Sequence, residues 1–125
     1  MSLVTEVDAG NWKQEVLDSN LLTAVDFWRL GCSWCERLSP VLDQVVEQYR
    51  GRIKFVKLNV LANPENRQIA VRYGVMGTPT VIFFCEGRPA ETFVGYTHKE
   101  RFELLLNRVL ENHRDCVRQS TELNN

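Results

Sequence analysis

The chain carries four cysteines, and two of them lie close together in the segment Cys32-Ser33-Trp34-Cys35. A structural zinc site needs a tetrahedral set of ligands, but the only histidines, His98 and His113, lie far along the chain and are not spaced as a ligand pair. A purely structural disulfide is also a weak interpretation, because closing so short a loop removes little entropy from the unfolded chain. The spacing favours a redox-active dithiol, and two small core residues at a helix start remain the alternative.

This segment lies between an apolar run and a helical stripe. Residues 21–28 are almost continuously apolar, which predicts a strand buried on both faces. Apolar residues then recur at helical spacing over residues 38–49, and Pro40 should kink that helix. Because free amide groups and the helix dipole favour an anion at a helix start, a thiolate is stabilised there. We expect Cys32, at an exposed cap, to be the nucleophile and Cys35, shielded one turn inward, to be the resolving thiol.

The rest of the chain alternates between strand and helix patterns. Strands are predicted over residues 4–7, 53–60, 80–84 and 91–94, the last two joined by a turn at Glu86-Gly87. Helices are predicted after three capping patterns, which are Asn11 with Gln14, Asn63 with Pro64, and Thr97 with Glu100. Strands that alternate with helices, followed by a hairpin and a last helix, indicate an α/β fold with a mixed central sheet flanked by helices on both faces.

Length and composition are those of one ordinary domain. The chain has 125 residues, of which 44% are apolar, so it can bury a layered core without metal or cross-links. We expect a single domain over residues 1–125, with its core at 4–112 and a frayed end at 118–125. The net charge of −1 argues against nucleic acid or an anionic membrane as a partner. No apolar stretch is long enough to span a bilayer.

The first residues bear on the compartment. Glu6 and Asp8 fall where a signal peptide would pass from basic to apolar residues, so we expect a cytoplasmic protein. The opening Met1-Ser2-Leu3 has the form of a cloning remnant, so a signal peptide removed from the natural chain stays an alternative.

Several segments, taken in order, resemble one known family. The resemblance is carried by Asp26-Phe27-Trp28, Cys32, Cys35, Pro40, Lys57, residues 73–80 and Gly95. The stretch from Asp26 to Pro40 is similar, position by position, to the active-site segment of the thioredoxins, and residues 73–80 resemble the segment that carries their cis-proline. The similarity covers roughly residues 4–112, which is far more specific than an isolated pair of cysteines.

The resemblance implies catalytic roles for four residues. Cys32 would attack substrate disulfides and Cys35 would release them. Asp26 would be a buried carboxylate beneath the pair that exchanges a proton with Cys35, with Lys57 nearby. Independently of the family, a carboxylate inside an apolar strand is costly unless it is paired or protonated. A structural ion pair between Asp26 and Lys57 is the alternative.

The resemblance also implies a substrate-binding surface. Thr78, before a cis Pro79, would hold the bound substrate chain through its backbone, and Gly95 and Trp28 would complete the surface. Only about 5% of X-Pro bonds in folded proteins are cis, so the cis expectation rests on the family. Trp34 is either a further substrate contact or an ordinary surface aromatic residue.

The chain departs from the family around the cysteines. Thioredoxins typically have Trp-Cys-Gly-Pro-Cys, whereas this chain has Gly31 before the first cysteine and Trp34 in place of the proline. Glu36 stands where many members have lysine, and Thr78 replaces a common apolar residue. Because proline has no N–H, Trp34 adds a donor that we expect to point towards the Cys32 sulfur and stabilise its thiolate.

These patterns predict a thioredoxin-like thiol–disulfide oxidoreductase that reduces protein disulfides and needs no metal or bound organic cofactor. We expect an upstream disulfide reductase as its electron source and a monomeric state. Two alternatives stay open, an oxidase or isomerase of an oxidising compartment, and a redox-sensing or chaperone-like binding module with little turnover. Cys85, expected at a strand end, and Cys116, expected in the last helix, have no evident partner.

Overall fold

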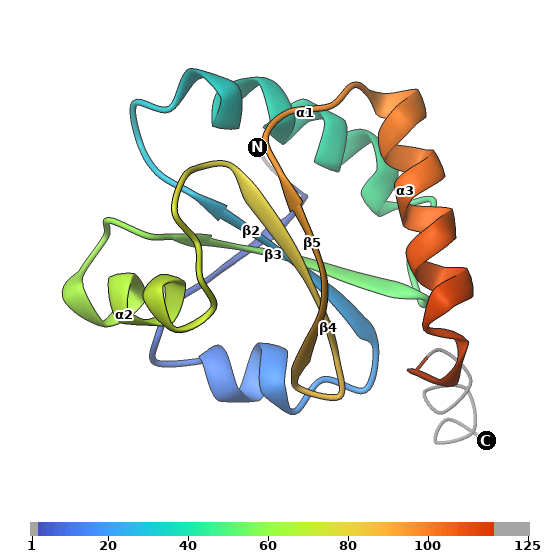
Figure 1. Cartoon of the computed structure of the whole chain (residues 1–125), viewed down its shortest axis with the longest axis horizontal. Helices are drawn as coiled ribbons and strands as arrows, with labels where there is room; N and C mark the ends of the chain where they lie inside the picture. Colours follow the sequence, from blue (N-terminus) through green and yellow to red (C-terminus); the bar gives the residue numbers. More distant parts are fainter. Residues whose placement is uncertain (1–2, 117–125) are drawn as a thin grey trace.

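The computed structural model of the chain describes residues 3–116 (Figure 1), so the frayed end expected at 118–125 lies outside the described residues. The elements, in order, are β1 (Thr5–Val7), a short π-helical turn η1 (Lys13–Leu17), β2 (Leu22–Trp28), α1 (Ser33–Val46), β3 (Ile53–Asn59), α2 (Pro64–Arg72), β4 (Thr80–Cys85), β5 (Arg88–Val94) and α3 (Lys99–Asn112). None of the helices among these residues has the length and apolar character needed to cross a membrane.

The five strands form one mixed sheet in the order β1-β3-β2-β4-β5. β1 and β2 both run parallel to β3, whereas β4 is antiparallel to β2 and β5 is antiparallel to β4. β2 and β4 are buried along almost their whole length, which explains their continuous apolar sequences. The α/β fold with a mixed central sheet, predicted from the sequence, is confirmed.

Helices cover both faces of the sheet (Figure 1). One core lies under α1 and α3, and it includes Leu38, Leu42, Ala24, Phe83, Phe102 and Leu106. The other lies under η1 and α2, and it includes Trp12, Val16, Phe27, Leu58, Ile69 and Phe84. Because successive strand residues point to opposite faces, Ala24 and Asp26 share the α1 face of β2, as Phe83 and Cys85 share that face of β4.

Two of the three predicted capping patterns are wrong. The Asn63 side chain caps α2 and accepts from Asn66 N at 2.8 Å, as expected. Asn11 instead accepts from Asp8 N at 2.8 Å, and the helical turn after it has Trp12 at its N-cap position with no side-chain cap. α3 likewise begins behind His98 without a side-chain cap. In both cases packing of the apolar face, and not the local pattern, sets where the helix begins.

The hairpin between β4 and β5 is tight and abuts η1. Glu86 and Gly87 have positive φ angles of 54° and 79°, as a two-residue hairpin turn with matching twist requires. A Cβ atom on Gly87 would lie 2.8 Å from the Leu17 carbonyl oxygen. β5 begins at Arg88, three residues before the predicted start, because an edge strand pairs through its backbone and needs no apolar pattern.

Cys85 and Cys116, which had no evident partner in the sequence, are joined by a disulfide bond. Cys85 ends β4, as expected, and Cys116 lies just beyond α3 in a further helical turn. The pairing could not be predicted from the sequence because the two residues are 31 positions apart and meet only when α3 packs back on the sheet.

Candidate active site

Cys32 and Cys35 occupy the junction of β2 and α1 and form a disulfide, with their Cα atoms 5.2 Å apart. Cys32 is the N-cap of α1 in an extended conformation, and Cys35 lies in the first turn. The expected difference in exposure is wrong for this oxidised form, because Cys32 is 5% and Cys35 4% exposed. The Cys32 sulfur is bonded to the buried Cys35, and the Thr78 side chain lies against it.

Two donors point at the Cys32 sulfur. Cys35 N lies 3.2 Å from it and Thr78 Oγ1 lies 3.4 Å from it. The expectation that the Trp34 amide would be this donor is wrong. An N-cap acceptor bonds the N–H two or three positions into the helix, and here the bond goes to the third, which is Cys35. Thr78, expected from the family resemblance to bind substrate through its backbone, supplies the second donor with its side chain.

Asp26 lies on the α1 face of β2 and is 4% exposed. Its Oδ1 atom has no hydrogen-bond partner among the described residues. Burial raises the pKa of Asp26 from 3.8 to about 7; the positive charge of Lys57 opposes this rise and the negative charge of Glu6 adds to it. Asp26 is therefore a carboxyl group that can bind or release a proton near neutral pH.

Lys57 is the register partner of Asp26 on β3. Its ammonium lies 5.5 Å from the centre of the Trp28 ring, above the ring face. No ion pair joins Lys57 to Asp26 in the part of the chain that the structure describes, so the geometry gives no support to the ion-pair alternative.

A small cavity connects Asp26 to the dithiol. It has a volume of about 160 Å³, and its lining includes Asp26, Cys35, Lys57, Ser39 and Trp28. Asp26, Ser39 and Lys57 contribute polar groups to its lining, and a cavity of this size has room for several water molecules. Asp26 and Cys35 thus line the same cavity.

Glu6 is a site residue that the sequence reasoning missed. It is the register partner of Lys57 between β1 and β3, and its Oε2 atom accepts a hydrogen bond from Trp28 Nε1 at 3.1 Å. Burial raises the pKa of Glu6, while the Trp28 hydrogen bond and the charge of Lys57 lower it. Only the strand order, which places β1 beside β3, brings Glu6 to the site, and the sequence pattern contains no signal of that order.

A groove beside the dithiol is lined by Trp34, Thr78, Pro79, Gly95 and Tyr96 and has a volume of about 270 Å³. The Thr78–Pro79 bond is cis, and Gly95 N donates to the Pro79 carbonyl at 2.9 Å. Four of the five residues expected to bind substrate therefore come together. Trp28 does not join them, because it lines the cavity with Asp26 below the cysteines.

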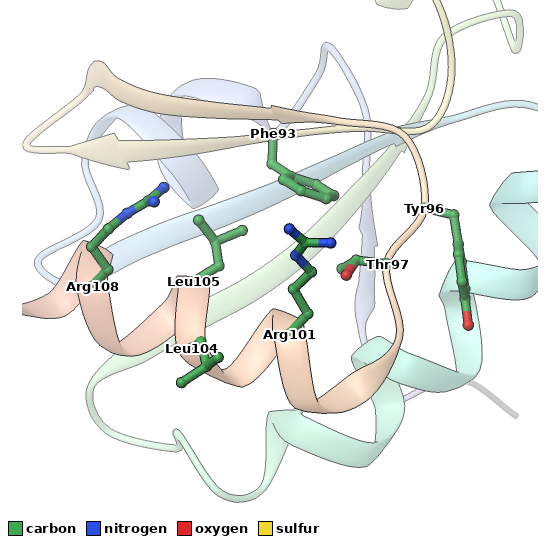
Figure 2. Close-up of a pocket in the computed structure, with 7 residues that line it drawn as sticks. All are labelled: Phe93, Tyr96, Thr97, Arg101, Leu104, Leu105 and Arg108. Atoms are coloured by element: carbon green, nitrogen blue, oxygen red, sulfur yellow. The ribbon is translucent and has the colours of Figure 1, made fainter.

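Tyr96 was not predicted from the sequence. Its ring centre lies 5.7 Å from that of Trp34, which is 51% exposed and also carries the Arg37 guanidinium at 4.8 Å. Figure 2 shows the Tyr96 ring extending towards α1, and Tyr96 also lines the hollow between β5 and α3 together with Phe93, Leu105 and Arg101. The two aromatic rings thus form one wall of the groove.

A second hollow lies on the other side of Thr78. Its lining includes the strongly exposed Leu61, Val71 and Met76, of which Met76 is 98% exposed. Exposed apolar side chains gathered around a concave site are typical of a surface that binds another protein. Thr78, which contacts the Cys32 sulfur, thus lines both hollows.

A helix-start dithiol, a buried carboxyl and a peptide-sized groove on a mixed five-stranded sheet define a thiol–disulfide oxidoreductase. Comparison with known proteins agrees. A family model described as Thioredoxin matches residues 3–108. The chain is 39% identical to "Thioredoxin 1" of Nostoc sp. over 113 residues, which are 90% of this chain and 99% of the relative.

Two further relatives show the range of the similarity. The chain is 37% identical to "Thioredoxin" of Pyropia yezoensis over 107 residues, 86% of this chain and 97% of the relative. It is 36% identical to "Thioredoxin M-type, chloroplastic" of Spinacia oleracea over 96 residues, 77% of this chain and 51% of the relative. The chain belongs to the thioredoxin family and is a thiol–disulfide oxidoreductase that acts on protein disulfides.

Proposed function

We propose that this protein reduces protein disulfides, with Cys32 as the nucleophile and Cys35 as the resolving thiol. The observation that carries this assignment is the Cys32 sulfur at the start of α1 with two donors directed at it. The Cys32 thiolate attacks one sulfur of the substrate disulfide and displaces the other as a thiolate. Cys35 then attacks the mixed disulfide, releases the second substrate thiol and leaves Cys32 and Cys35 oxidised.

We propose that Asp26 is the proton acceptor for Cys35. A resolving thiol must lose its proton before it attacks, and the nearby carboxyl has a pKa of about 7. The cavity between them supports transfer through water. Lys57 and Glu6 act as positioning residues that set the charge around Asp26.

We propose that the groove holds an extended segment of the substrate. Thr78 and Gly95 line the groove beside Pro79, while Trp34 and Tyr96 supply an apolar wall. Backbone hydrogen bonds to an extended peptide recognise its conformation, and the flanking apolar side chains recognise its sequence.

Each turnover leaves the protein oxidised, so an upstream disulfide reductase must return electrons to Cys32 and Cys35. We propose that the protein works as a monomer of a single domain in the cytoplasm, where thiols are kept reduced. The family match over residues 3–108 and the single sheet support the single-domain assignment. Light scattering on the purified chain and fractionation of the source cells test the monomer and the compartment.

The test of the proposed function is insulin reduction by dithiothreitol, with mixed-disulfide trapping as a second readout. The protein should accelerate insulin precipitation, and both Cys32→Ser and Cys35→Ser should abolish the acceleration. Cys35→Ser should retain partner proteins as mixed disulfides on a non-reducing gel, while Cys32→Ser retains none. Equal trapping by the two variants would overturn the division of roles.

A further inference from the structure

The second pair of cysteines lies at the end of the sheet opposite the active site. β4 begins at Thr80, one residue after Pro79, and ends at Cys85. A strand advances about 3.3 Å per residue, so Cys85 lies roughly 16 Å further along than Thr80. Cys32 therefore cannot reach Cys85 within one molecule, and the two pairs must exchange electrons separately.

Strand geometry directs Cys85 towards α3. Cys85 shares the face of Val81 and Phe83 and packs against the core under α1 and α3. The Cα atoms of Cys85 and Cys116 are 5.9 Å apart, within the range that a disulfide can bridge.

A non-covalent clamp holds Cys116 in place independently of the sulfurs. Glu91 on β5 binds the end of α3 through His113 Nε2 at 2.9 Å, Asn112 Nδ2 at 3.3 Å and the Arg108 guanidinium at 3.7 Å. Cys116 N then donates to the His113 carbonyl at 3.1 Å. Glu91 faces Phe83 across the hairpin, so the clamp lies two residues from Cys85 in β4. Contacts that do not involve the sulfurs thus hold the end of α3 beside the hairpin that carries Cys85.

The surroundings of this pair favour the disulfide over the thiolates. Cys116 is 4% exposed, and no hydrogen-bond donor points at either sulfur among the described residues. A buried thiolate without donors is disfavoured. The ring closed between Cys85 and Cys116 also spans 31 positions against 3 in the active site, so its closure restricts the unfolded chain more.

We propose that Cys85 and Cys116 form a second redox site, a disulfide that fastens the end of α3 to β4 and that resists reducing conditions under which Cys32–Cys35 opens. Its oxidant is a low-molecular-weight disulfide such as oxidised glutathione. The thiolate of Cys85, the more exposed partner, attacks one sulfur and displaces one glutathione thiolate. Cys116 gives up its proton and attacks the mixed disulfide at Cys85, which releases the second glutathione. Two protein thiols are oxidised and one small disulfide is reduced to two thiols.

The test uses the Cys32→Ser/Cys35→Ser variant of the full chain, in which only the second pair can react. The variant is treated with oxidised glutathione, freed of the excess, and unfolded in a denaturant that contains a maleimide. The maleimide should then label no thiol. After dithiothreitol it should label Cys85 and Cys116. Thermal unfolding of the oxidised variant should lie roughly 10 °C above that of the reduced variant. Two reactive thiols after oxidation, or coincident melting curves, would overturn the proposal.

A titration of the unaltered chain tests the order of reduction. The chain is equilibrated in mixtures of reduced and oxidised dithiothreitol, alkylated and digested for mass analysis of the peptides. Half-reduction of Cys85–Cys116 should need a ratio of reduced to oxidised dithiothreitol at least tenfold higher than half-reduction of Cys32–Cys35. A lower or equal ratio contradicts the proposal. Cys85→Ala is the matched control. In this variant dithiothreitol should lower the melting temperature only by the amount due to reduction of Cys32–Cys35. The variant should still reduce insulin. Since the first experiment removes the active-site cysteines, its failure is distinguishable from failure of the proposed function.

Discussion

Asp26 makes stability depend on pH in a direction that is unusual for a carboxylate. Its pKa is 3.8 before folding and about 7 in the folded chain. Between these values the folded protein holds a proton that the unfolded chain has released, so stability falls as pH rises through this interval and stays low above it. Asp26→Asn should raise the free energy of unfolding at pH 8 by up to about 4 kcal/mol and leave it nearly unchanged at pH 4.

Urea denaturation at the two pH values measures this effect, with Asp18→Asn, which removes an exposed partner of Lys13, as the control that should change little. The same Asp26 variant should slow release of the trapped substrate at neutral pH. Lower stability of Asp26→Asn at pH 8 would favour the structural ion pair with Lys57.

Thr78 offers a second prediction at the scale of one residue. A hydroxyl that donates to a thiolate stabilises the reduced form, which makes the couple more oxidising. Thr78→Val removes the donor 3.4 Å from the Cys32 sulfur. Hydrogen bonds to charged groups contribute about 1.5–3 kcal/mol, and 30 mV corresponds to about 1.4 kcal/mol, so the potential should become more negative by about 30–60 mV.

Equilibration with glutathione measures the potential. Thr97→Val is a matched control, since the buried Thr97 hydroxyl has no partner within the described chain and its loss should leave the potential unchanged. An unchanged potential in Thr78→Val would show that the hydroxyl does not act on the sulfur. Trp34→Pro, by contrast, leaves the Cys35 amide in place and should not remove the hydrogen bond from that amide to the Cys32 sulfur.

Among the elements, the β4–β5 hairpin is the one most sensitive to a single added methyl group. Gly87 combines a φ of 79° with a Cβ position 2.8 Å from the Leu17 carbonyl oxygen. Gly87→Ala should therefore lower the free energy of unfolding by about 3 kcal/mol through backbone strain and displacement of η1. Gly51 is the matched control, because its φ is 85° but nothing lies within 4 Å of a Cβ there.

Gly51→Ala should cost only the backbone term, about 1 kcal/mol. Urea denaturation of the two variants separates strain from collision, and equal losses would show that η1 gives way without cost.

Local sequence determined the elements that are buried or capped by their own residues. The apolar run of β2, the helical stripe of α1 and the Asn63 cap of α2 were all predicted because each signal lies within a few residues. The starts of η1 and α3 were not, because packing against the sheet chose them over the capping patterns. The largely exposed start of β5, Arg88-Pro89-Ala90, was missed because pairing with β4 through the backbone leaves no mark in the side chains.

At the scale of the whole molecule, what was missed depends on strands and helices that are distant in sequence. The residues between Asp26 and Cys35 could be placed from one continuous segment. To place Glu6 at the site, one must know that β1 pairs with β3. To pair Cys85 with Cys116, one must know that α3 packs back on the sheet. Periodicity reports which face of an element is buried but not which other element covers it.

The link between Cys85 and Cys116 has a mechanical consequence. A chain pulled by its two ends unravels to its contour length, but the segment between these residues is bypassed by the bond. At about 3.5 Å per extended residue, the 31 positions would add about 100 Å more than the 5.9 Å that the bond spans. In a force–extension experiment the oxidised chain should therefore stop about 100 Å short of the reduced one, with β5 and α3 shielded from the load.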